Sequence, residues 1–335
     1  MSLVELLDVP APAKINLFLH VVGRRADGYH LLQSPFVLVD WMDSLHFERR
    51  ADGRLQRHDL GPALPAEDLC LRAARALQSA SGTTLGADIH IDKQVPWGAG
   101  MGGGSSDAAS TLLALNRLWG LNWTRARLAE LGLRLGADVP FFIGGDNAFV
   151  EGIGERLTPL SLPPLRLAVV KPPAAIATAE IFGHEALKRD TEAVIVMGYF
   201  ERGQARAVKT AASQPGGWKP EGLQHDESGP YWKTEELDFG RNDLQAPAEN
   251  RCPEVAQAAQ WLQARYGNSR MTGSGSAVFA RLKTESCKTL DGVVDREANA
   301  IAPPLATFPA AELPPGWVGR LCSSLVQHPL RGWAD

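Results

Sequence analysis

The sequence contains few cysteines, no marked excess of either charge and no apolar run long enough to span a membrane. Its four cysteines lie far apart without Cys-x-x-Cys spacing, which argues against a zinc site or a disulfide framework and predicts reduced thiols. The net charge of −4 leaves no basic footprint, so we expect no nucleic-acid partner. Residues 1–10 carry acids rather than the basic start of a leader peptide, so we expect a cytoplasmic protein without a membrane partner.

The stretch that is hardest to explain as structure alone is residues 95–109. Five of the seven residues 98–104 are glycine, so the backbone there is open to close approach and free to adopt positive φ. Ser105 and Ser106 follow, and then apolar residues at helical spacing, so either serine is a candidate N-cap. A glycine loop that leads into a helix N-terminus favours an anion. The stretch therefore predicts a phosphate-binding loop.

Other interpretations of this loop fit less well. It is not a Walker P-loop, because no Gly-Lys-Ser/Thr closes it. The spacing Gly98-x-Gly100-x-x-Gly103 matches the dinucleotide-binding fingerprint, but the preceding strand, residues 87–95, alternates polar and apolar residues. A central strand of a dinucleotide-binding fold is apolar almost throughout. A flexible linker rarely separates a strand from a strongly patterned helix.

The first predicted strand, residues 11–22, carries two polar residues on one face. Lys14 and Asn16 are two positions apart and point the same way, opposite Ile15 and Leu17. From the pattern alone, a solvated strand face is the simpler explanation for the pair. A turn at 23–28 and strands at 35–39 and 43–48 predict an antiparallel meander. His30, after the turn, is by itself more typical of a surface histidine than of a ligand.

A second isolated polar residue is Asp138. Helices are predicted at 68–81, from the glycine loop to Trp119, and at 124–135 with Thr124 as N-cap and Gly136 as the stop. Asp138 then lies between that glycine and an apolar run. It is either the cap of a short helix that contains Pro140 or a carboxylate at the edge of a cleft, able to orient or deprotonate a hydroxyl.

The second half of the chain has a weaker pattern. Strands are predicted at 149–157, 165–170 and 317–326, and helices at 177–182 with Thr178 as cap, at 253–266 and at 287–300. Residues 201–241 are polar and rich in glycine and proline, which predicts a surface insertion. Residues 271–280 run from a glycine turn into a strand, an arrangement that a tight hairpin would also explain.

Taken together, residues 13–16, 96–109 and 273–276 resemble the three motifs of the GHMP small-molecule kinases. Residues 25–30 and 136–142 are similar to the branch of that family that phosphorylates CDP-methylerythritol, in the non-mevalonate (MEP) route to isoprenoid precursors. The resemblance is good over residues 8–182 and 242–282. In the loop, Trp97 and Met101 stand where the family usually has smaller or aliphatic residues, and Ser276 where it often has Gly or Pro.

The resemblance implies a two-domain α+β GHMP kinase fold. Residues 1–163 would form an N-terminal domain of the ribosomal-protein-S5-domain-2-like type, and residues 164–335 a C-terminal ferredoxin-like α/β domain with the insertion at about 201–241. It also implies an enzyme that uses ATP and Mg²⁺ on a small-molecule substrate, CDP-methylerythritol. We expect it to be a monomer or a weak homodimer.

The resemblance assigns roles to individual residues. Asp138 would accept the proton of the substrate hydroxyl, with Lys14 beside it as a counter-charge. Tyr29 and Phe182 would enclose the cytosine, with His30 at its edge. Asn16 and Thr178 would line the acceptor site. The ATP phosphates would bind to Pro96, Gly98, Gly100, Gly102, Gly103, Gly104, Ser105, Ser106, Gly273, Ser274 and Gly275, with Ser106 also a ligand of the metal.

Two alternatives remain open at this point. Another GHMP kinase, acting on homoserine or mevalonate, would share the glycine loop but would not need the cytosine clamp of Tyr29, His30 and Phe182. A nucleotide-binding regulator on the same scaffold would not need to retain Lys14 and Asp138.

Overall fold

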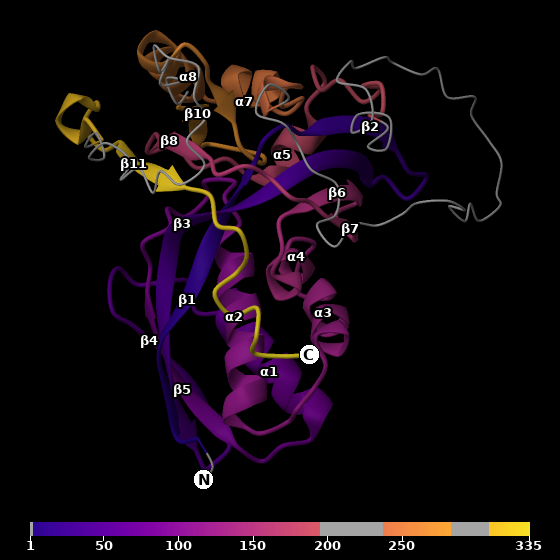
Figure 1. The fold of residues 1–335 in the computed structure, drawn as a ribbon, viewed down its shortest axis with the longest axis vertical. Helices are drawn as coiled ribbons and strands as arrows, with labels where there is room; N and C mark the ends of the chain where they lie inside the picture. The colour runs from indigo at the N-terminus through magenta and orange to yellow at the C-terminus, as the bar shows by residue number, and fades with distance from the viewer. Residues whose placement is uncertain (1–2, 195–236, 283–307) are drawn as a thin grey trace, which may run out of the picture.

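The computed structural model describes residues 3–194, 237–282 and 308–335, and Figure 1 shows their arrangement. The first sheet is mostly antiparallel and follows the order β4-β5-β3-β6-β7, with β1 and β2 also paired to β3. Among the described strands of this sheet, β4 and β5 are the only pair that runs in parallel. Its strands are β1 (Glu5–Asn16), β2 (His20–Arg24), β3 (His30–Arg50), β4 (Leu55–Asp59), β5 (Gly86–Asp92), β6 (Ala148–Gly152) and β7 (Arg156–Pro159).

The strand β3 corrects the expected meander. The two strands predicted at 35–39 and 43–48 are parts of this one continuous strand. The second predicted strand starts at Asp43, but Asp43 is buried within β3 and accepts hydrogen bonds from the backbone N–H groups of Gln94 and Val95. Because its carboxylate is satisfied inside the protein, the strand does not need to break there.

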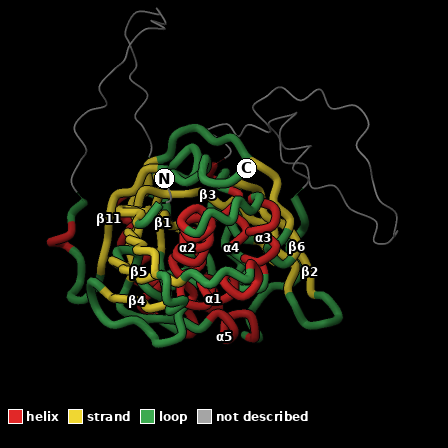
Figure 2. Tube along the Cα trace, turned by 90° about the horizontal axis from the view of Figure 1, so that it is seen from below, coloured by secondary structure: helices red, strands yellow, loops and turns green. Residues whose placement is uncertain are grey.

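Four helices pack together against the first sheet, and Figure 2 shows them grouped within the curve of the strands. Asp68 caps α1 by accepting from the N–H of Leu71, and Thr124 caps α3 by accepting from Arg127, as predicted for Thr124. The apolar stripe of α2 is fully buried in the main core. The helices are α1 (Leu69–Ser81), α2 (Gly103–Leu118), α3 (Arg125–Leu133) and α4 (Val139–Gly144).

The second sheet is antiparallel in the order β11-β8-β10-β9. It forms the upper half of Figure 1 together with α5, α7 and α8. The two sheets and their helices make an α+β fold, as expected. The elements are β8 (Arg166–Lys171), α5 (Thr178–Gly183), α7 (Gln245–Arg251), α8 (Pro253–Tyr266), β9 (Arg270–Met271), β10 (Val278–Arg281), the short 3₁₀ helix η2 (Ala310–Glu312) and β11 (Val318–Ser323).

The two halves are joined by more than the chain connection at residue 163. An isolated bridge pairs Leu19 with Asn242, and after β11 the chain returns to the helices of the first half. There the N–H of His328 donates to Gly145 and the N–H of Arg125 donates to Asp335. The domain boundary at 163/164 stays a prediction, because the last residues pack on the first half.

Several predicted element ends are wrong. The helix α2 begins at Gly103, with Gly102 as N-cap at φ 72, so neither Ser105 nor Ser106 is the cap. The cap of α5 is Ala177 and not Thr178, and residues 149–157 are a hairpin of β6 and β7 rather than one strand. The helix predicted at 287–300 and most of the insertion at 201–241 lie outside the described residues. Across the part of the chain that is described, no helix is long and apolar enough to cross a membrane.

Candidate active site

The glycine loop runs from the end of β5 to the start of α2 and is anchored through its carbonyl oxygens. The carbonyl of Met101 accepts from the N–H of Lys14 at 2.9 Å. The carbonyls of Gly98 and Ala99 accept from Ser276 and Ala277 at 3.2 and 3.1 Å. The first N–H groups of α2 have no acceptor within their own helix and carry the positive end of its dipole. The loop is therefore fixed from behind, at a helix end that suits an anion.

Two glycines bring the loop against the late turn at residues 272–276. A Cβ built at Gly100 would lie 2.4 Å from the carbonyl oxygen of Thr272, and one at Gly273 would lie 2.4 Å from that of Gly100. Both residues have positive φ, 73° and 55°. No other residue type fits this contact between two backbones. The two glycine motifs that the sequence separates widely thus form one surface.

A cavity of about 380 Å³ opens in front of this loop. The loop, together with Lys93 and Val95, forms one wall, and the segment between β4 and α1 forms the other with Leu64, Pro65 and Asp68. Trp97 is 72% exposed at its mouth. The combination of apolar side chains with a few charged groups is typical of a small-molecule site.

Lys14 and Asp138 meet beside the loop. The Nζ of Lys14 lies 3.7 Å from Oδ2 of Asp138 and donates to Oδ1 of Asn16 at 2.5 Å. The ammonium also lies 4.6 Å from the centre of the Phe36 ring. Burial lowers the pKa of Lys14, while the charge of Asp138 acts to raise it. The pair therefore places a buried cation next to a carboxylate that remains partly open to solvent.

The solvated strand face is wrong, whereas Asp138 does stand at the N-cap of a short helix that contains Pro140, as the structural alternative predicted. Lys14 and Asn16 are 3% and 1% exposed, so they do not form a solvated strand face. Asp138 occupies the N-cap position of α4, but its side chain makes no capping hydrogen bond. Asn16 is held from two sides, because its backbone N–H donates to Thr272 and its side-chain amide donates to Ser34.

The residues predicted to enclose the cytosine ring of the acceptor, and Thr178 of the acceptor site, lie around α5. The rings of His30 and Phe182 stack with centres 5.0 Å apart, while Tyr29 is 61% exposed. Arg189, which the sequence did not single out, donates to Nε2 of His30 at 3.1 Å. Burial lowers the pKa of His30, and Arg189 adds to that effect. Thr178 shares a hydrogen bond of 2.8 Å with Ser274, so the acceptor side joins the late glycine turn.

Sequence reasoning missed the charged cluster of Asp43, Lys93 and Asp107. The Nζ of Lys93 donates to Asp107 at 2.6 Å and to Asp43, and both carboxylates are buried. Burial acts to lower the pKa of Lys93, but the two carboxylates outweigh it and the net change is upward. Because Asp43 also accepts from the backbone of 94 and 95, the cluster ties β3, the end of β5 and the first turns of α2 together. Asp107 belongs to the motif at 96–109, but no motif joined it to Asp43 and Lys93, since the three lie on separate elements.

The hydroxyl of Ser106 is the feature that best suits a metal or phosphate ligand. It is fully buried, and its Oγ has no hydrogen-bond partner. The same holds for Oδ1 of the neighbouring Asp107. No group of three or more His, Cys, Asp or Glu residues suited to a metal ion occurs within the described ranges. A cation here would therefore share its ligands with a bound phosphate, as Mg²⁺ usually does.

Comparison with known proteins agrees with this geometry. Family models match the GHMP kinases N terminal domain at residues 68–146 and the GHMP kinases C terminal at 233–286. Proteins named 4-diphosphocytidyl-2-C-methyl-D-erythritol kinase from Methylibium petroleiphilum and Variovorax paradoxus are 57% and 50% identical. The matches cover 100% of both chains in the first case and 98% of both in the second.

Solved structures give the same result. A crystal structure titled 4-(cytidine 5'-diphospho)-2C-methyl-D-erythritol kinase matches with a TM-score of 0.60 and 35% identity, over 82% of this chain and 88% of that one. A homoserine kinase from Cytophaga hutchinsonii matches at 0.54 over 82% and 84% of the two chains, but with 16% identity it shares the fold alone. The fold and the loop thus define a GHMP-type kinase, an enzyme class that uses ATP. Within that class the chain belongs to the family of 4-diphosphocytidyl-2-C-methyl-D-erythritol kinases.

Proposed function

We propose that this protein transfers the γ-phosphate of ATP to the 2-hydroxyl of CDP-methylerythritol, in the non-mevalonate (MEP) route to isoprenoid precursors. The observation that carries the proposal is the Lys14–Asp138 pair at 3.7 Å, beside a glycine loop at a helix N-terminus. The names of the relatives, at 47–57% identity over nearly the whole chain, support the choice of substrate.

The nucleotide is proposed to bind with its base in the 380 Å³ cavity and its phosphates on the loop. Backbone N–H groups from Gly98 to Ser105 would hold the phosphates, since the N–H of Ser106 donates to Gly102 at 2.9 Å. Pro96 would set the entry of the loop. Gly273, Ser274 and Gly275 would approach from the second sheet, because Gly100 and Gly273 are in backbone contact. Ser106 would supply its unpartnered hydroxyl to Mg²⁺, which neutralises phosphate charge when bound.

The chemistry follows from the two charged groups. Asp138 accepts the proton of the acceptor hydroxyl, which makes that oxygen a better nucleophile. Lys14 stabilises the negative charge that develops on the transferred phosphoryl group. Its position is fixed by Asn16 and by the backbone bond to Met101, so little reorganisation is needed. Phosphoryl transfer depends mostly on such positioning and charge stabilisation.

The acceptor is proposed to lie along α5 and the start of β3. Tyr29 and Phe182 would enclose the cytosine, and His30 would bond to its edge. Arg189 supports this role, because it donates to Nε2 of His30 and so favours the neutral ring with its proton on Nδ1. Thr178 and Asn16 would line the path to the reacting hydroxyl.

A coupled kinase assay with CDP-methylerythritol, mevalonate and homoserine tests the proposal. We expect turnover with CDP-methylerythritol and little with the other two. Turnover only with mevalonate or homoserine would overturn the choice of substrate. Nucleotide binding without turnover of any acceptor would favour a regulator.

We also propose that the protein acts in the cytoplasm, as a monomer or weak homodimer. The cysteines Cys70, Cys252 and Cys322 are buried and free, which supports a reducing compartment. Sedimentation velocity across a range of protein concentrations tests the assembly state, and a stable higher oligomer would contradict it.

A further inference from the structure

The outer wall of the nucleotide cavity is a segment with almost no regular structure of its own. It runs from the end of β4 at Asp59 to the start of α1 at Leu69. Leu64, Pro65, Glu67 and Asp68 of this segment line the cavity. An irregular segment has no backbone ladder to hold it, so its shape depends on other contacts.

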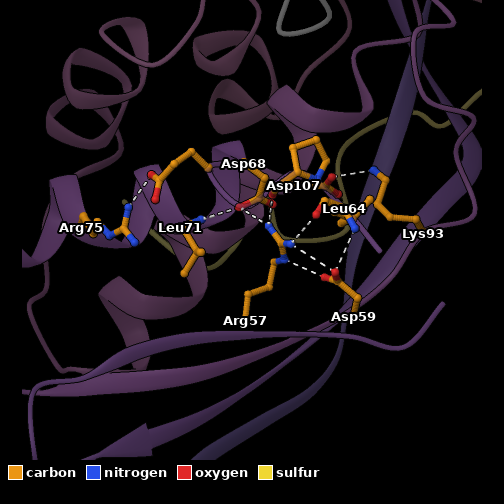
Figure 3. A network of polar contacts seen from close by, with 10 residues as sticks. Arg57, Asp59, Leu64, Asp68, Leu71, Arg75, Lys93 and Asp107 are labelled. Atoms are coloured by element: carbon orange, nitrogen blue, oxygen red, sulfur yellow. Dashed lines mark hydrogen bonds and ion pairs between the residues drawn. The ribbon is translucent and has the colours of Figure 1, made fainter. Parts of the chain in front are cut away.

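Most of those contacts involve one side chain, Arg57, as Figure 3 shows. Its guanidinium donates to both carboxylate oxygens of Asp59, at 2.6 and 3.1 Å, and lies 2.9 Å from Oδ1 of Asp68. It also donates to the backbone carbonyls of Pro65 and Leu64, at 2.9 and 3.2 Å. The side chain is only 7% exposed. Every one of these acceptors belongs to the segment 59–68.

The carboxylates of Asp59 and Asp68 also accept hydrogen bonds from backbone N–H groups, so the network holds the main chain as well. Asp59 accepts from the N–H of Leu64 at 2.9 Å, so Leu64 is held through both its N–H and its carbonyl. Asp68 accepts from the N–H of Leu71 and thereby caps α1. Arg57 therefore connects the strand β4, the cavity wall and the first turn of α1 in one network.

We propose that Arg57 is a positioning residue for the nucleotide, which shapes the wall against which the base packs. The inference rests on the proposed function, because it assumes that this cavity takes the base of ATP. The opposite wall does not depend on Arg57, since the glycine loop is fixed by Lys14, Ser276 and Ala277. Loss of Arg57 thus weakens nucleotide binding and leaves the acceptor site unchanged. A lysine cannot replace it, because only the planar guanidinium offers several donors in a fixed fork.

The test compares Arg57→Lys and Arg57→Gln with wild type by calorimetric titration of a non-hydrolysable ATP analogue and, separately, of CDP as a probe of the acceptor site. Both variants are expected to weaken the ATP analogue by about tenfold, corresponding to one lost charge-assisted contact. Affinity for CDP is expected to stay at the wild-type value. Arg54→Gln is the matched control. Arg54 directly precedes β4, is exposed and pairs with Asp52, and neither residue belongs to the segment 59–68 or lines the cavity, so its loss is expected to change neither affinity.

Wild-type affinity of both Arg57 variants for the ATP analogue would overturn the inference. So would an equal loss of affinity for CDP, because that would show a general effect on the fold. If the Arg57 variants do not fold, Asp59→Asn weakens the same network with a smaller change, and the same two outcomes decide. Binding is measured without turnover. Absence of activity on CDP-methylerythritol would therefore contradict the proposed function but would leave the inference about Arg57 unaffected.

Discussion

The ammonium of Lys14 and the carboxylate of Asp138 lie 3.7 Å apart, although one comes from β1 and the other from the start of α4. Neither has a purely structural use that would account for it. Asp138 stands at the N-cap of α4, but its side chain makes no capping hydrogen bond. Lys14 is buried at a cost that its partners offset only in part, since its pKa is lowered overall. A buried charge retained at such a cost is typical of a functional site.

Replacing Asp138 by Asn is expected to reduce kcat by at least the order of a hundredfold, because the general base is lost while the shape is kept. Asp138 lies at the acceptor side rather than in the nucleotide cavity, so affinity for ATP is expected to stay nearly unchanged. A coupled assay gives kcat, and titration of an ATP analogue gives the affinity. Near-normal turnover would show that Asp138 is structural.

Lys14→Met removes the ammonium but keeps a side chain of similar length in the buried site. We expect kcat to fall by roughly the order of a hundredfold, as for loss of one preorganised charge-stabilising group. Combined with Asp138→Asn, the loss is expected to be well below the product of the two single losses, because the residues act as a unit. Steady-state kinetics of the four proteins check this. Strictly multiplicative losses would mean that the two side chains act independently.

Gly102→Ala is expected to lower the free energy of unfolding by about 1–3 kcal/mol, since it forces a residue with a side chain to keep a left-handed backbone conformation. The added Cβ would lie 2.9 Å from the Phe142 ring and 3.2 Å from Cγ of Lys14. Denaturant unfolding measures the change.

Gly104→Ala is the matched control for that stability measurement. Gly104 lies two residues further on, and its Cβ would meet only Leu69 at an ordinary 3.5 Å. The free energy of unfolding of Gly104→Ala is expected to stay within about 0.5 kcal/mol of the wild-type value. Equal losses in both variants would mean that the close approach at Gly102 is not what matters.

Acid is expected to destabilise the fold in part through His328. Burial, with Arg125 nearby, lowers the pKa of His328 from 6.5 to about 3. Between these pH values His328 is protonated in the unfolded chain and neutral in the folded protein. The contribution of His328 to the free energy of unfolding is therefore fully present above pH 6.5 and is lost as the pH drops toward 3. His328→Asn keeps an acceptor for the N–H of Leu330 and removes the titration.

Denaturant unfolding between pH 7 and pH 5 measures this effect. The variant is expected to show a shallower loss with acid than wild type, by at most about 1.4 kcal/mol per pH unit. His184→Asn is the control, because His184 accepts from Ala186 in the same way but is not fully buried. Identical pH slopes in wild type and His328→Asn would contradict the prediction.

The sequence was sufficient for features that are local. Glycine spacing and the apolar stripe located the loop and α2, and the predicted cap Thr124 marked a helix start that the structure has. Prediction from the sequence failed where contacts between residues far apart in the chain determine the local structure. The meander predicted at 35–48 is one continuous strand, because Asp43 is satisfied inside the protein by Lys93 and by the backbone that follows β5.

The same limit applies to the site. Lys14 and Asn16 could not be distinguished from a solvated strand face until the loop and the late turn were placed over them. Arg57 and Arg189 belong to no motif, and their contacts are known only once the chain is folded. The family resemblance supplied the pairing of Lys14 with Asp138, which periodicity alone did not.

A crystal structure of the protein with a non-hydrolysable ATP analogue and CDP-methylerythritol tests the central claim most directly. We predict the triphosphate on the glycine loop, with the acceptor hydroxyl within hydrogen-bond reach of Asp138 and the terminal phosphate next to Lys14. A nucleotide bound elsewhere, or an acceptor hydroxyl remote from both side chains, would contradict the account.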